Sequence, residues 1–76
     1  MVKFIGHWMF ASHIWHDEKP SPVVINMREI AYIDEHIDHV HGKHVVVSLN
    51  CEDDIPIEGD IIEVLSAFQK HLSTMY

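Results

Sequence analysis

The sequence predicts an α+β fold, with a small antiparallel sheet of four to five strands and one C-terminal amphipathic helix at about residues 60–72. Three observations lead to this prediction: short segments rich in β-branched and aromatic residues, turn residues between them, and helical periodicity near the end. With 76 residues, the chain has the size of one domain. A single cysteine allows no internal disulfide, so a metal or self-association would have to supplement a small core.

The first strands are expected on both sides of a proline-rich break. Residues 2–15 are rich in aromatic and β-branched side chains, and we predict one long strand there, or a strand broken at a bulge around Gly6. The break is Glu18–Pro22, where two prolines fix φ and remove backbone donors. A short strand is expected to follow at Val23–Ile25.

Two more strands are expected after a turn at residues 42–43. Because Pro56 lacks an N–H, the strand at residues 55–57 is predicted to lie at a sheet edge or to begin at the proline. Residues 44–49 alternate as a strand does. One face carries Val45, Val47 and Leu49, and the other carries His44, Val46 and Ser48.

The last segment has the spacing of an amphipathic helix. Asp60 followed by Glu63 matches a variant of the capping box, which predicts the start of the helix. The apolar stripe is formed by Ile61, Leu65, Phe68 and Leu72, and Ile62 and Val64 widen it.

Residues 26–41 fit two structures. Asn26 could cap a helix and Gly42 could end it, whereas the β-branched content and Tyr32 favour a strand. On local pattern alone, a helix is slightly favoured. Its apolar face would be Ile30, Ile33, Ile37 and Val40.

The stretch Val24–Glu35 reads V-I-N-M-R-E-I-A-Y-I-D-E. It resembles the I-N-x-x-x-I-x-x-I-E step of FlbD-type flagellar-operon and prophage proteins, and is similar to the first half of LytTR-type domains. Those families continue with a hairpin, a strand ending in I-x-V-x-E-S and a helix of x-E-V-x-x-x-L form. The matching places here are Val45–Leu49, Ile55–Asp60 and Glu63–Leu65, so the resemblance spans about residues 22–70.

The resemblance implies a small curled antiparallel sheet, a short turn at Met27–Ile30 and one C-terminal helix, with no catalytic residues. It thus favours a strand over a helix after the turn. The chain departs from the pattern in its longer aromatic N-terminus and its histidine-rich residues 34–42. The LytTR resemblance would suggest DNA binding, but the basic residues that this needs are missing.

The charge balance of the chain limits the classes of partner that it is expected to bind. Five Lys and Arg stand against twelve Asp and Glu, a formal net charge of −7, which disfavours direct binding to nucleic acid or an anionic membrane. The acidic residues between Lys43 and Lys70 could form a docking surface for a basic protein, with Asp53, Asp54 and Asp60 as its candidate contacts. No run of apolar residues is long enough for a membrane span, and we expect a cytoplasmic protein.

Residues 34–44 contain the densest group of potential metal ligands. Imidazole and carboxylate bind zinc, nickel or copper, and a turn could bring His44 across to His41, with a third ligand from Asp38 or His36. The spacing matches no standard motif, and a polar, exposed hairpin explains the composition as well. The candidate ligands are His36, His39, His41 and His44.

The aromatic residues of the N-terminal segment exceed what a core of this size readily covers. Trp8, Phe10 and Trp15 are therefore candidates for a self-association or partner surface. Three acidic residues follow Cys51 and disfavour its thiolate, and no catalytic motif occurs. We expect a non-catalytic interaction or accessory module that forms a homodimer or larger assembly, or docks on another protein. The alternatives are a metal-binding module and an acidic, phage-type inhibitor of a basic nucleic-acid-binding protein.

Overall fold

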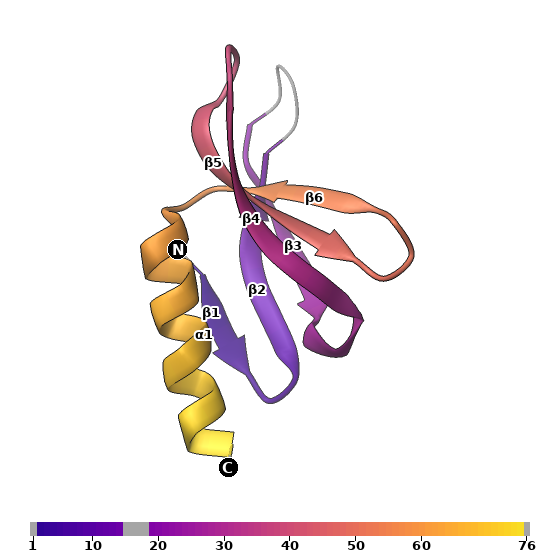
Figure 1. Cartoon of the computed structure of the whole chain (residues 1–76), viewed down its shortest axis with the longest axis vertical. Helices are drawn as coiled ribbons and strands as arrows, with labels where there is room; N and C mark the ends of the chain where they lie inside the picture. Colours follow the sequence, from indigo (N-terminus) through magenta and orange to yellow (C-terminus); the bar gives the residue numbers. More distant parts are fainter. Residues whose placement is uncertain (1, 15–18, 76) are drawn as a thin grey trace.

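Six antiparallel strands form one open, twisted sheet in the computed structural model, which describes residues 2–14 and 19–75 (Figure 1). The strand order is β1-β2-β6-β5-β4, and β3 pairs with β2. The α+β class is confirmed, with six strands instead of four to five. In chain order the elements are β1 (Lys3–Ile5), β2 (Trp8–His13), β3 (Ser21–Asn26), the 3-10 turn η1 (Met27–Glu29), β4 (Ile30–Asp38), β5 (Gly42–Leu49), β6 (Asp54–Ile57) and α1 (Ile61–Met75).

The extra strand arises at Gly6, where the sequence predicted a bulge. Ile5 pairs with Trp8, so Gly6 and His7 form a two-residue hairpin turn between β1 and β2. Gly6 has a φ of 58°, as a glycine at the first position of a type II′ turn requires. The aromatic segment therefore doubles back on itself.

Residues 27–38 form a turn and a strand, so the slight local preference for a helix was wrong. The Asn26 side chain accepts a hydrogen bond from the backbone N–H of Arg28, 3.0 Å away, and this starts η1 instead of an α-helix. β4 then pairs with β5 from Ile30 to Asp38, with an irregularity between Ile30 and Tyr32. Pairing with a distant strand thus overrides the local helical spacing.

The two predicted faces of β5 are confirmed, but the prediction for Pro56 was wrong. Val45 and Val47 lie in the core, and His44, Val46 and Ser48 are buried on the opposite face. β6 lies between β5 and the end of β2, and it begins before the proline. The Pro56 carbonyl accepts from the N–H of Ile14, so the missing N–H faces the β2 side, where pairing is short. Pro56 therefore removes no hydrogen bond from the pairing of β6 with β5.

The C-terminal helix closes the core. Asp60 caps it, because its Oδ1 accepts from the backbone N–H of Ile62 at 2.7 Å. Phe68 packs edge-on against Phe4 of β1, with ring centroids 5.6 Å apart. No helix in residues 2–14 or 19–75 is long and apolar enough to cross a bilayer. The buried core consists of Met9, Ala11, Ile25, Val45, Val47, Ile57 and Val64.

Candidate functional site

The strands β1, β2 and β3 direct one set of side chains away from the core. Residues directly opposite each other in an antiparallel pair point to the same side of the sheet. Met9 and Ile25 are paired and point inward, so their neighbours along the strands point outward. We call this outward set the outer face: Lys3, Ile5, Trp8, Phe10, Ser12, Pro22, Val24 and Asn26.

The outer face is largely apolar and open to solvent. Ile5 is 54% exposed, Val24 52%, Trp8 42% and Phe10 38%. Phe10 pairs with Val24 and Ile5 pairs with Trp8, so the four side chains are contiguous. Apolar patches of this kind are typical of interaction sites. Trp15, the third aromatic candidate, lies outside the described residues.

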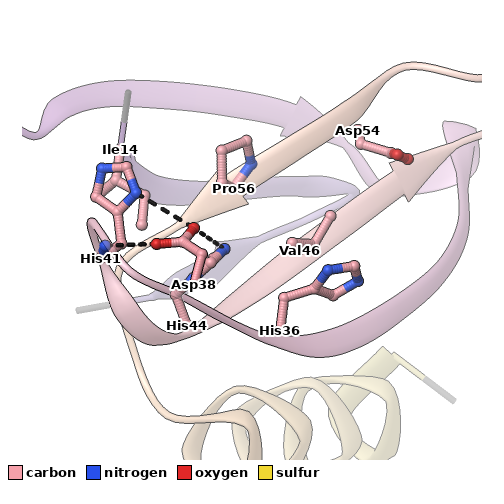
Figure 2. Close-up of a pocket in the computed structure, with 8 residues that line it drawn as sticks. All are labelled: Ile14, His36, Asp38, His41, His44, Val46, Asp54 and Pro56. Atoms are coloured by element: carbon pink, nitrogen blue, oxygen red, sulfur yellow. Dashed lines mark hydrogen bonds and ion pairs between the residues drawn. The ribbon is translucent and has the colours of Figure 1, made fainter. Parts of the chain in front are cut away.

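A second candidate site is a pocket of about 260 Å³ at the far end of the β4–β5 hairpin (Figure 2). We call it the histidine pocket. Ile14 after β2, Pro56 of β6 and Val46 of β5 form its apolar wall, and its polar groups come from β4, β5, the turn between them and the first residue of β6. Its lining consists of Ile14, His36, Asp38, His41, His44, Val46, Asp54 and Pro56.

Asp38 occupies the centre of the polar group. Its Oδ1 accepts from the backbone N–H groups of Val40 and His41, at 2.9 and 2.6 Å. These bonds direct Oδ2 to His41 Nδ1 at 3.6 Å and to His44 Nε2 at 3.8 Å, as Figure 2 shows. The hydrogen bond from the His41 N–H is the main cause that holds the pKa of Asp38 below its ordinary value, while burial opposes it.

The side chain of His44 is oriented by a contact on the side of its ring away from Asp38. Its side chain is buried, and Nδ1 lies 3.0 Å from the carbonyl oxygen of Gly42. Donation from Nδ1–H to this carbonyl leaves Nε2 as the nitrogen that faces Asp38. His36 lies to one side of this pair (Figure 2), with its ring centroid 6.3 Å from that of His44. Its Nε2 lies 3.5 Å from Oδ2 of Asp34.

The four histidines proposed as metal ligands do not all meet. His36, His41 and His44 line the pocket, whereas His39 lies in the exposed turn and is not part of the lining. Residues 42–43 were predicted as that turn, but the turn is formed by residues 39–41, and this shift turns His39 away and brings in Asp38. Within the described residues, no group of three or more His, Cys, Asp or Glu side chains is already arranged to hold a metal ion.

The three acidic candidates are split between two places. Asp53 and Asp54 lie in and after the turn between β5 and β6, while Asp60 lies at the start of α1, beyond the other end of β6 (Figure 1). Asp60 also caps the helix. The thiol of Cys51 donates to Oδ2 of Asp53 at 3.4 Å. Sequence alone could not separate these residues, because their separation depends on where β6 is placed.

Comparison of the chain with known protein families, with curated proteins and with solved structures finds no match.

Proposed function

We propose that this chain is a small non-catalytic interaction module that pairs with a second copy of itself through the outer face. The observation that supports the proposal is the contiguous, solvent-exposed group of Ile5, Trp8, Phe10 and Val24 on one side of β1–β3. Two such faces can pack around a two-fold axis, in which each copy presents the same surface.

The charge distribution favours a second copy at this face. Lys3 is the only charged member of the eight residues that make up the outer face, all of which lie in the described part of the chain. The acidic residues from Glu52 to Asp60 lie instead in the connections after β5 and β6 and at the start of β6. Contact between two outer faces therefore avoids the like-charge repulsion that a net charge of −7 would cause elsewhere.

The size of the face sets the expected affinity. Stable interfaces use roughly 20–30 residues a side, and the outer face has eight. We therefore expect a weak dimer, with a dissociation constant of about micromolar order. Removal of a central aromatic should cost about 2 kcal/mol, or roughly 30-fold in affinity.

Sedimentation equilibrium tests the proposal, with the 8.9 kDa chain measured over a range of concentrations. The wild type should approach twice the monomer mass, and Trp8→Ser and Phe10→Ser should each need roughly 30-fold higher concentrations to reach the same average mass. Ile62→Ser is the matched control, because Ile62 is an exposed apolar residue on α1, away from the outer face. A wild type that stays monomeric at high concentration would refute the proposal, as would a dimer that both outer-face variants leave intact.

A further inference from the structure

We propose that the free edge of β4 binds an extended peptide segment of a partner protein, which adds to the sheet as an antiparallel strand and carries lysine or arginine opposite the acidic middle of β4. Among the described strands, β4 lies at one end of the sheet order and pairs with β5 alone. It has nine residues, a length that natural edge strands usually avoid. The proposal is independent of the self-association proposed above, because β4 contributes no residue to the outer face.

The backbone contacts of β5 show which residues of β4 face the free edge. In an antiparallel strand, the N–H and C=O of one residue point to the same side, and successive residues alternate between the two sides. The Leu49 N–H bonds to the carbonyl of Asp53 on the β6 side, so every second residue before Leu49 also faces β6. The β4 partners of these residues therefore turn their backbone groups to the free edge. They are Ile33, Glu35 and Ile37.

The middle of this edge is occupied by a side chain that an added strand can replace. Oδ1 of Asp34 accepts from the N–H of Glu35 at 2.8 Å, which agrees with an N–H that points away from β5. A carbonyl of the added strand would take over this N–H. The Asp34 carboxylate, 58% exposed, would then be released to a basic side chain of the same strand, so no hydrogen bond of Glu35 is lost.

Charge favours a basic segment over a second copy of the chain at this edge. Asp34, Glu35 and Asp38 all lie on β4, and the Glu35 carboxylate has Lys43 of β5 at 3.8 Å. Two β4 strands paired about Glu35 would place this carboxylate opposite its own copy, and like charges directly opposite each other are destabilising. A lysine or arginine opposite Asp34 and Glu35 forms favourable pairs instead.

A pocket beside the edge offers a place for one apolar side chain of the added strand. It has a volume of about 260 Å³ and lies between β4 and α1, with Tyr32, Ile33, Leu65 and Phe68 in its walls. Ile33 is paired with Val47 of the core, so the residue opposite Ile33 in an added strand points to the same side of the sheet. Tyr32 is 60% and Leu65 46% exposed, which leaves the pocket open. In strand addition, such pockets supply specificity and the backbone supplies affinity.

An NMR titration of the isotopically labelled chain tests the proposal. The probe is a synthetic peptide of sequence V-T-K-K-L-T with blocked ends, which we call the basic peptide. In the antiparallel register its leucine lies opposite Ile33 and its lysines lie opposite Asp34 and Glu35. We expect saturable shifts that are largest at the amides of Ile33, Glu35 and Ile37, with a dissociation constant of about 0.1–1 mM.

Two N-methylated forms of the basic peptide are matched controls that leave the protein unchanged. Methylation at the first lysine and the leucine removes the N–H groups that face β4, and it should weaken binding at least about tenfold. Methylation at the first threonine and the second lysine removes N–H groups on the far side, and binding should stay within about twofold of the unmodified peptide. Equal losses from the two forms would overturn the proposal.

Changes of charge and of the apolar anchor test the other two parts. The peptide V-T-E-E-L-T should bind at least about tenfold more weakly than the basic peptide, and V-T-K-K-S-T about tenfold more weakly. Asp34→Lys should weaken binding of the basic peptide about fivefold. Asp53→Lys is its matched control, since it makes the same change of charge in the turn after β5, and it should bind as the wild type does. The spectra of both variants report whether the fold is intact.

Four other results would overturn the proposal. They are the absence of saturable shifts at millimolar peptide, shifts that are largest outside β4 and the pocket beside it, equal binding of V-T-E-E-L-T, and equal losses in Asp34→Lys and Asp53→Lys. If the amides of β4 shift with the concentration of the chain itself before peptide is added, a second copy covers the edge, and the assignment to a basic partner segment is wrong.

Discussion

Val64→Ala is the sharpest test of the packing of α1, because the sequence assigns Val64 and Ile62 the same role in the apolar stripe. Val64 is 1% exposed and Ile62 is 71% exposed. Val64→Ala removes two buried methyl groups, worth about 0.8 kcal/mol each, and the cavity that remains adds about 0.5 kcal/mol. The higher helix propensity of alanine offsets about 0.5 kcal/mol of this loss of stability. The free energy of unfolding should therefore fall by about 1.5–2 kcal/mol.

Ile62→Ala is the control for this substitution. It removes one more carbon than Val64→Ala does, but most of that surface is already in water, and the gain in helix propensity offsets the rest. Its free energy of unfolding should stay within about 0.5 kcal/mol of the wild type. Urea unfolding at one fixed protein concentration measures both variants. Equal losses in the two variants, or a Val64→Ala variant as stable as the wild type, would show that α1 does not pack as described.

Two further predictions concern the carboxylates that accept backbone hydrogen bonds. Asp60→Ala should lower the free energy of unfolding by about 1 kcal/mol, because it removes the cap of α1, and urea unfolding would detect this. Asp38 has a lowered pKa in the folded chain, so the stability it contributes is complete above its unfolded pKa of about 3.9 and is lost as the pH falls through the folded value. In EDTA, the urea midpoint of the wild type should consequently fall more steeply below pH 4 than that of Asp38→Asn; parallel curves would contradict this.

Local signals in the sequence were sufficient for parts of the fold. Asp60 and the residues after it specify the start of α1 within a few positions, because a cap depends only on its immediate neighbours. The alternation of residues 44–49 likewise predicted which side chains of β5 enter the core. The outer face was partly predicted, since Trp8 and Phe10 were singled out as surplus aromatics, and both are exposed.

Features that depend on distant segments were not predictable in the same way. The strand at residues 30–38 is determined by its partner β5, although its own apolar spacing suits a helix. Pro56 lies inside the sheet because its missing N–H faces the short pairing with β2. In the histidine pocket, a shift of the turn by two or three residues decides that Asp38 joins the group and His39 leaves it.

The sheet consists of two three-stranded meanders, β1–β3 and β4–β6, which are joined through one paired position, His13 and Ile57. Within each meander the strands are joined by short connections, so their pairing closes small loops at low entropic cost. The junction joins residues 44 positions apart in the chain (57 minus 13), and two backbone bonds support it, from Ile14 N–H to Pro56 and from Glu58 N–H to Ser12. Assembly of the two meanders is therefore the step that pairs distant segments of the chain through few backbone hydrogen bonds, and it should govern the rate at which the chain folds.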